Sequence, residues 1–164
     1  MELYLITGFL GAGKTTFLKN FARQFAGRRL RLIINEFGRA GVDGTLLREL
    51  DAALDEISNG SIFCACRLDQ FEAALEQAAA DAPDVVLVEA SGLADPTNVR
   101  RVLAQFPAVS YQGSVCVADA ARLEKVFSTA RACPRQLAVS SLVLLNKTDL
   151  ATEAQCAEAK ALIL

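Results

Sequence analysis

Short apolar runs alternate with amphipathic segments along the whole chain, and this alternation predicts a succession of strands and helices. The first amphipathic segment places Phe17, Leu18, Phe21 and Phe25 on one helical face, and Gly27 closes it. The apolar runs are nearly continuous, which is typical of strands covered on both faces by helices. They occupy residues 3–7, 30–34, 84–88, 114–118 and 142–145. We therefore expect an α/β fold, a three-layer sandwich with a mostly parallel central sheet.

The segments between these runs predict further elements. Residues 45–54 and 68–80 have helical composition, and a last helix is expected to begin near Thr152. Asn59-Gly60 is a strong signal for a two-residue hairpin, with a short strand on either side. We find no linker, repeat or low-complexity segment, so residues 1–164 are expected to form a single domain.

Composition and charge narrow the classes of function. The 164 residues are 52% hydrophobic and 22% charged, which describes a chain able to bury one core. A net charge of −2 gives no electrostatic reason to expect a nucleic acid or an anionic membrane, and no apolar run approaches the roughly 20 residues that span a bilayer. The five cysteines are an odd number and there is no histidine. We expect reduced thiols and a cytoplasmic location, with no nucleic-acid or membrane partner.

The candidate chemistry begins in the turn after the first strand. The segment GFLGAGKT at residues 8–15 matches the phosphate-loop pattern G-x-x-x-x-G-K-[ST], and it lies between an expected strand and an expected helix. Backbone N–H groups of such a loop surround phosphate oxygens, Lys14 reaches the β and γ phosphates, and the Thr15 hydroxyl ligates Mg²⁺. The sandwich is therefore expected to be that of a P-loop NTPase. The expected nucleotide contacts in this segment are Gly8, Gly11, Ala12, Gly13, Lys14, Thr15 and Thr16.

The segment NKTD, residues 146–149, follows the last apolar run and is a candidate for base recognition. The Asp149 carboxylate can accept hydrogen bonds from N1–H and the 2-amino group of guanine, whereas adenine has an acceptor at N1 and lacks that amine. Lys147 would cover the base with its aliphatic stem, and Asn146 would tie the segment to the phosphate loop. These features predict binding of GTP and GDP in preference to adenine nucleotides.

Acidic residues follow two more of the expected strands. Glu89 comes directly after the run at 84–88 and is a candidate for acting on Mg²⁺ or its water shell, and Gly92 for letting the backbone approach the γ-phosphate. Glu36, after the second strand, should also lie near the phosphates. Lys14, Glu89 and Glu36 are the candidate catalytic residues, although Glu89 could instead be a solvated loop carboxylate. We find no arginine finger or water-orienting glutamine, so hydrolysis should be slow.

Taken in order, GFLGAGKTT, NEFG with Asp43, ISNG, VEASGLADP and NKTD resemble the motifs of the CobW family of GTP-dependent metallochaperones, from residue 3 to residue 150. The resemblance implies a GTPase that couples its nucleotide state to delivery of Zn²⁺, Co²⁺ or another divalent ion to a metalloprotein client. It also implies that two subunits can pair across their nucleotides as a homodimer. The family tends to continue into a further strand and a second domain, which residues 1–164 lack.

The cysteines after the Asn-Gly turn depart from the family pattern. The family usually has C-x-C-C, whereas the aligned residues here are SIFC at 61–64, followed by Cys66. On a strand, Cys64 and Cys66 would point to the same side and could hold one soft ion, with Glu36, Asp69 or a partner subunit completing the ligands. The alternative is two small, inert thiols. Cys116 lies in an apolar strand and is expected to belong to the core.

Two other functions are compatible with the same loop. A P-loop small-molecule kinase would need an arginine-rich lid, for which Arg100-Arg101 and Arg131 with Arg135 are candidates. A nucleotide-gated interaction module would need no transition metal. Transfer of the γ-phosphate to an acceptor other than water would identify the kinase, and partner binding that survives loss of both Cys64 and Cys66 would favour the interaction module.

Overall fold

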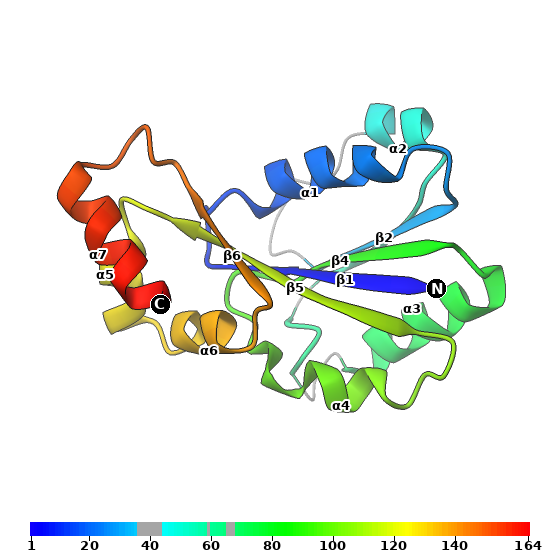
Figure 1. The fold of residues 1–164 in the computed structure, drawn as a ribbon. Coiled ribbons are helices and arrows are strands. Elements are labelled where there is room, and N and C mark those ends of the chain that lie inside the picture. Colours follow the sequence, from blue (N-terminus) through cyan, green and yellow to red (C-terminus); the bar gives the residue numbers. More distant parts are fainter. Residues whose placement is uncertain (36–43, 59, 65–67) are drawn as a thin grey trace.

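The computed structural model describes residues 1–35, 44–58, 60–64 and 68–164, and its centre is a six-stranded sheet (Figure 1). The strand order is β3-β2-β4-β1-β5-β6, and every neighbouring pair is parallel. The strands are β1 (Glu2–Thr7), β2 (Leu30–Asn35), β3 (Ala53–Ile57), β4 (Val85–Glu89), β5 (Ser110–Asp119) and β6 (Leu142–Asn146). The prediction of a mostly parallel central sheet is confirmed.

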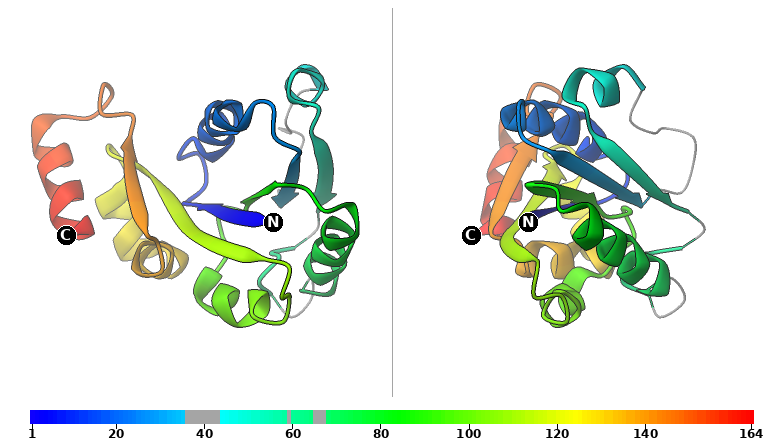
Figure 2. Two further views of the ribbon diagram at one scale, coloured as in Figure 1. Left: turned by 45° about the vertical axis from the view of Figure 1, so that its right-hand side comes forward. Right: turned by 90° about the vertical axis from the view of Figure 1, so that its right-hand side faces the viewer.

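Helices cover both faces of this sheet, as the views in Figure 2 show. One face carries α1 (Lys14–Ala22), the short η1 (Arg23–Phe25) and α2 (Gly44–Leu50). The opposite face carries α3 (Leu68–Asp81), η2 (Pro96–Asn98) and α4 (Val99–Leu103). The last three helices pack near β5 and β6: α5 (Leu123–Thr129), α6 (Ala132–Ala138) and α7 (Glu153–Ile163). The three-layer sandwich is therefore confirmed.

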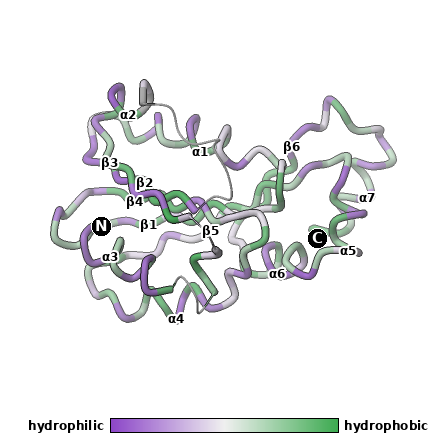
Figure 3. Tube along the Cα trace, turned by 180° about the vertical axis from the view of Figure 1, so that it is seen from behind, coloured by the Kyte–Doolittle hydropathy of each residue, from purple (hydrophilic) through white to green (hydrophobic). Residues whose placement is uncertain are grey.

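Alternate residues of the central strands enter opposite layers of the core, as the period of two in a strand requires. Leu3 and Leu5 pack with residues of α3 and α4, whereas Ile6 packs with residues of α1. These strand side chains are fully buried, and each stabilises the fold by about 1.5–3 kcal/mol. The helices in turn carry both hydrophilic and hydrophobic segments (Figure 3). Among the described residues, no helix combines the length and apolar character that crossing a bilayer requires.

The region after the second strand differs from the prediction. The helix expected over residues 45–54 ends at Leu50, and the chain then forms β3. The buried guanidinium of Arg31 on β2 explains why this segment is a strand: its Nε and Nη2 donate to the Asp55 carboxylate at 2.6 and 2.9 Å. The same guanidinium also pairs with Asp81 of α3, so Asp55 is one of two carboxylates that offset the cost of burying this cation. The pair with Asp55 helps to hold this segment beside β2 as a strand.

The strand expected after Asn59-Gly60 is not formed in residues 60–64, and Asn59 itself lies outside the described residues. β3 pairs in parallel with β2, and residues 60–64 form a turn at 62–63 with bends at 60 and 64, without a strand. An Asn-Gly pair favours a tight turn, but a two-residue hairpin can connect only antiparallel strands. The strand that would have aligned Cys64 with Cys66 is therefore not formed at Cys64, while Cys66 lies outside the described residues.

Candidate functional site

The parallel sheet brings its strand ends together at one edge. Because all strands run in the same direction, the residues that follow β1, β2, β4, β5 and β6 meet at their carboxyl ends, where α/β proteins bind ligands. Residues at four of these strand ends fall at this edge: the phosphate loop after β1, Asn35 at the end of β2, Glu89 with Gly92 after β4, and Asn146 with its loop after β6. Glu36 is one residue beyond the described part of β2.

The phosphate loop has the backbone that a phosphate cradle needs. Gly8 and Gly13 have φ values of +130° and +103°, a region that side chains disfavour, and α1 begins at Lys14 directly after the second of them. A Cβ on Gly8 would lie 2.2 Å from the carbonyl oxygen of Val117. The loop therefore wraps tightly against β5, and the N-terminus of α1 faces the cradle.

A pocket of about 250 Å³ opens above this loop. Its walls are the loop itself, from Leu10 to Thr16, and four residues from neighbouring strand ends, namely Asn35, Glu89, Ser91 and Gly92. Lys14 is 8% exposed, and its Nζ donates to the carbonyl of Phe9 at 3.3 Å. The ammonium group is thus held within the cradle, where it can approach phosphate oxygens.

Thr15 and Glu89 meet inside this pocket although 74 residues separate them in sequence. The Thr15 hydroxyl donates to Oε1 of Glu89 at 2.9 Å, and Glu89 is only 3% exposed. A hydroxyl and a buried carboxylate are hard oxygen ligands, so this pair fits Mg²⁺. Glu89 is therefore not a solvated loop carboxylate.

Gly92, which the sequence predicts to let the backbone approach the γ-phosphate, lies close to the phosphate loop. A Cβ at this position would lie 2.5 Å from the backbone nitrogen of Leu10, so only glycine fits without a shift of the backbone. The segment after β4 is also held by Gln136 of α6, whose Nε2 donates to the carbonyls of Gly92 and Ala94 at 3.2 and 2.9 Å. Sequence reasoning did not identify Gln136.

The base-recognition segment is fastened to the phosphate loop by two side chains. Nδ2 of Asn146 donates to the carbonyl of Ala12 at 2.9 Å, which agrees with the link expected from the sequence. Nζ of Lys147 donates to the carbonyl of Gly11 at 2.6 Å, and Lys147 has a φ of +57°. Asp149 is exposed two residues further on, so its carboxylate can reach a ligand. The two predicted binding segments thus form one continuous surface.

The structure adds Asp119, at the end of β5, to this surface. Its Oδ2 accepts a hydrogen bond from Nζ of Lys147 at 2.8 Å, and its Oδ1 accepts one from the backbone of Ala121 at 3.1 Å. Asp119 is 9% exposed. The signal was present in the sequence, because Asp119 directly follows an apolar strand, as Glu89 does.

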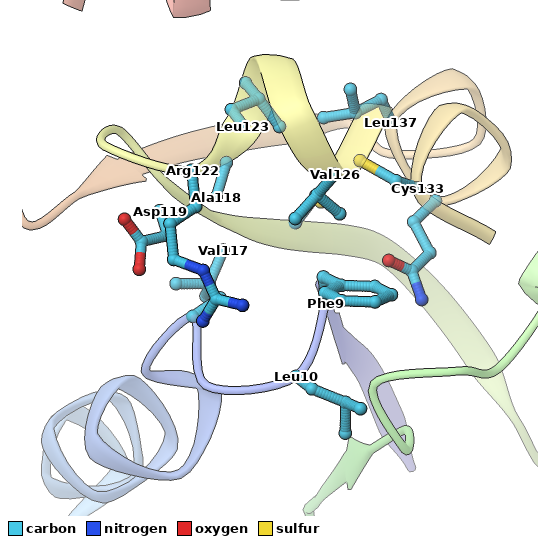
Figure 4. Close-up of a pocket in the computed structure, with 13 residues that line it drawn as sticks. Phe9, Leu10, Val117, Ala118, Asp119, Arg122, Leu123, Val126, Cys133 and Leu137 are labelled. Atoms are coloured by element: carbon cyan, nitrogen blue, oxygen red, sulfur yellow. The ribbon is translucent and has the colours of Figure 1, made fainter. Parts of the chain in front are cut away.

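A small apolar cavity lies behind the phosphate loop, between β5, α5 and α6 (Figure 4). It encloses about 20 Å³, room for about one water molecule. Phe9 of the loop points into it, opposite Val126 and Cys133. Cys116 lines it too, and burial raises the pKa of the Cys116 thiol to about 12, with a smaller contribution from Cys133. The apolar side chains that line the cavity surround Phe9 of the phosphate loop. Cys116 is buried, so the prediction that it belongs to the core is confirmed.

The candidate transition-metal ligands are only partly described. Cys64 is exposed, and Asp69 lies in the first turn of α3 nearby in sequence. Glu36 and Cys66 fall outside the described residues. Within the described ranges, no group of three or more potential metal-binding side chains is clustered. The metal site therefore stays a prediction from the sequence.

The sequence matches the family model described as the CobW/HypB/UreG nucleotide-binding domain over residues 2–163. The chain belongs to the CobW/HypB/UreG family. The zinc chaperone CobW of Pseudomonas aeruginosa is 32% identical over 185 residues, which cover 91% of this chain and 49% of that protein. The zinc chaperone YeiR of Escherichia coli is 33% identical over 153 residues, covering 90% and 47%.

Solved structures of CobW/HypB/UreG relatives show the same fold. The Zn(II)-bound YjiA GTPase from Escherichia coli superposes with a TM-score of 0.70 at 24% identity, covering 99% of this chain and 54% of that one. HypB from Archaeoglobus fulgidus superposes with a TM-score of 0.62 at 19% identity, covering 99% and 76%. The chain spans about half the length of the curated relatives it matches.

Proposed function

We propose that this CobW/HypB/UreG domain binds and slowly hydrolyses GTP, and that its nucleotide state controls transfer of a divalent metal to a metalloprotein client. The observation that carries the nucleotide half is the pair of bonds from Asn146 and Lys147 to the carbonyls of Ala12 and Gly11. These bonds join the base-recognition segment and the phosphate loop into one site. An isolated phosphate loop would not discriminate between bases.

Each residue of the site has a role in this proposal. Lys14 and the backbone N–H groups of residues 8–16 balance the charge of the β and γ phosphates. Thr15 and Glu89 would hold Mg²⁺, which supplies further neutralisation of the phosphate charge when bound. Glu89 and Glu36 are the groups proposed to orient the attacking water. Asp149 accepts hydrogen bonds from guanine, and Gly92 lets the backbone approach the γ-phosphate.

The metal half of the proposal is supported by the relatives and by one thiol. Curated relatives carry the name zinc chaperone, and Cys64 is an exposed soft ligand in the described part of the chain. Zn²⁺ or Co²⁺ would be the cargo, held by Cys64, Cys66 and further oxygen ligands. A reducing cytoplasm keeps such thiols available. A homodimer formed across the nucleotides belongs to the same proposal.

A kinase has less support from the described residues. The guanidinium of Arg100 lies over the ring of Tyr111 at 5.2 Å, and Arg135 forms an ion pair with Asp95. Both arginines are therefore engaged by their own neighbours. Transfer of phosphate to water is the reaction we propose.

Calorimetric titration tests the nucleotide half. We expect GDP to bind at least about 100-fold more tightly than ADP, because adenine leaves the Asp149 carboxylate unsatisfied. Lys14→Ala should abolish binding of GTP. Equal affinity for ADP and GDP would refute the guanine assignment. For the metal half, Zn²⁺ titration should show stoichiometric binding that falls in Cys64→Ser, and binding unaffected by that change would refute the thiol's role.

A further inference from the structure

Asn35, the last residue of β2, makes hydrogen bonds to two separate parts of the chain. It is 1% exposed and forms part of the wall of the phosphate pocket. Its Nδ2 donates to the carbonyls of Ile57 and Gly60 at 3.0 and 2.6 Å. Its Oδ1 accepts from the backbone N–H groups of Ile62 and Ser91 at 3.0 and 3.3 Å. One amide thus serves two donors and two acceptors of the backbone.

This bonding pattern is specific to the amide. Asparagine offers two N–H donors and an oxygen that can accept two bonds, so its full capacity is used here. Aspartate would place a charge against the carbonyls of Ile57 and Gly60, and serine can reach only part of the set. Because β2 is paired on both sides, by β3 and β4, the backbone of Asn35 is held in place, while its side chain can turn with its bonding partners. Both parts of the chain are therefore linked through this side chain.

One of these parts leads to Cys64. Ile62 is fully buried, and Phe63 packs edge-to-face on Phe71 with ring centroids 5.8 Å apart. The carbonyl of Cys64 accepts from the N–H of Leu68 at 3.0 Å, at the start of α3. Cys64 is exposed at the end of this braced turn. A shift of the N–H of Ile62 would therefore be passed directly to the thiol.

The other part is the phosphate side of the pocket. Ser91 lies two residues after Glu89 and directly before Gly92, whose backbone touches the phosphate loop at Leu10. A γ-phosphate that draws in the backbone at Gly92 must also move the N–H of Ser91. That N–H shares its acceptor oxygen with the N–H of Ile62.

We propose that Asn35 is a positioning residue that couples occupancy of the γ-phosphate site to the position of residues 60–64, which end at Cys64. This inference deepens the proposed function, since it names the connection between the nucleotide and the thiol. The coupling is a free energy shared between two sites and transmitted by one side chain. It does not require Asn35 to touch either ligand.

The test uses thiol chemistry, so it does not depend on metal binding. The rate of iodoacetamide alkylation at Cys64 is measured by peptide mass spectrometry, with GDP and with a non-hydrolysable GTP analogue. In the wild-type chain we expect the two rates to differ by about fivefold or more. In Asn35→Ser, at saturating nucleotide, the ratio should fall to about one.

Controls separate coupling from loss of stability. Ser114→Ala removes a buried hydroxyl that donates to the carbonyl of Val139 at 3.1 Å, far from both parts, and should keep the wild-type ratio. Asn35→Asp keeps the shape of the side chain, and the ratio of the two alkylation rates at Cys64 should also fall to about one in this variant. In the wild type, which needs no substitution, the GTP analogue should change hydrogen exchange at the amides of Ser91 and Ile62 together.

The outcomes distinguish this inference from the proposed function. A wild-type ratio of one, a ratio retained in the Asn35 variants, or a change of exchange at Ser91 alone would each overturn the coupling. A further outcome is that Zn²⁺ fails to bind while the two alkylation rates differ in the wild type and become equal in Asn35→Ser. That result would support the coupling and contradict the metal half of the proposed function.

Discussion

The ammonium group of Lys147 lies 2.8 Å from the carboxylate of Asp119, across 28 residues of sequence. The same ammonium reaches the carbonyl of Gly11 in the phosphate loop. Asp119 therefore orients the lysine whose stem is proposed to cover the base. The side chains of Lys147 and Asp119 are 32% and 10% exposed, so the pair is partly shielded from solvent.

We expect Asp119→Ala to weaken GDP binding about tenfold, because a charge-assisted hydrogen bond in a partly shielded site contributes about 1.5–3 kcal/mol. KM for GTP should rise while kcat changes little, since the base end of the nucleotide does not take part in the reaction. Asp119→Asn keeps a hydrogen-bond acceptor, so its affinity for GDP should lie between those of the wild type and Asp119→Ala. Glu124→Gln on the exposed side of α5 is the matched control. Wild-type GDP affinity in Asp119→Ala would show that Lys147 is held without it.

Glu89→Gln should remove the Mg²⁺ dependence of GTP binding. Glutamine can still accept the hydrogen bond from Thr15, but it lacks the charge that attracts a divalent cation. In the wild type, EDTA should weaken GTP binding about tenfold or more, whereas in the variant EDTA should have little effect. Fluorescent-nucleotide titration with and without Mg²⁺ measures both. A variant with the wild-type response to EDTA would mean that Glu89 does not contribute to the Mg²⁺ site.

Gly8→Ala and Gly27→Ala form a matched pair, because both glycines have positive φ values but differ in their surroundings. A Cβ at Gly8 meets the carbonyl of Val117, whereas a Cβ at Gly27 meets nothing within 4 Å. Gly27→Ala should cost about 1–2 kcal/mol of unfolding free energy from backbone strain alone. Gly8→Ala should cost at least about 2 kcal/mol more, as measured by urea unfolding. Equal losses would contradict the close packing of the loop against β5.

Burial of Cys116 predicts a loss of stability at alkaline pH. The pKa of this thiol rises from its ordinary value of 9.0 to about 12 in the folded protein. Between these values the unfolded chain releases the proton first, so the folded state binds more protons and unfolding becomes easier as pH rises. Below pH 9 the effect is absent. Urea unfolding from pH 8 to 10.5 should show a shallower decline for Cys116→Ala than for Cys156→Ala, and equal slopes would argue against a buried thiol.

The core of the fold was predictable because its signals are local. The apolar runs marked five of the six strands, and Thr152 marked the capped start of α7 through its own capping box. β3 was not predictable in the same way. It is an edge strand with little buried surface, and it is held by its pairing with β2 and by the ion pair from Asp55 to Arg31 of that strand. Local composition favoured a helix, and the Asn-Gly pair favoured a hairpin.

Prediction of the site followed the same division. The link from Asn146 to the phosphate loop was expected from a motif. Gly92 was expected to let the backbone approach the γ-phosphate, and its closeness to Leu10 is what the structure adds. Asp119 could have been found by applying the rule for strand ends to β5. Gln136 and the network at Asn35 could not, because their partners are backbone groups that only the folded chain brings into place.

The opposite rim of the sheet has a practical use. At the amino ends of the strands, Arg28 pairs with Glu2 and Arg29 with Asp84, both on exposed side chains. Exposed pairs of this kind contribute little to stability. In a chain with Cys64→Ser and Cys66→Ser, a fluorophore or surface tether attached through a cysteine substituted for Arg29 would thus leave the mouth of the nucleotide pocket open to solution.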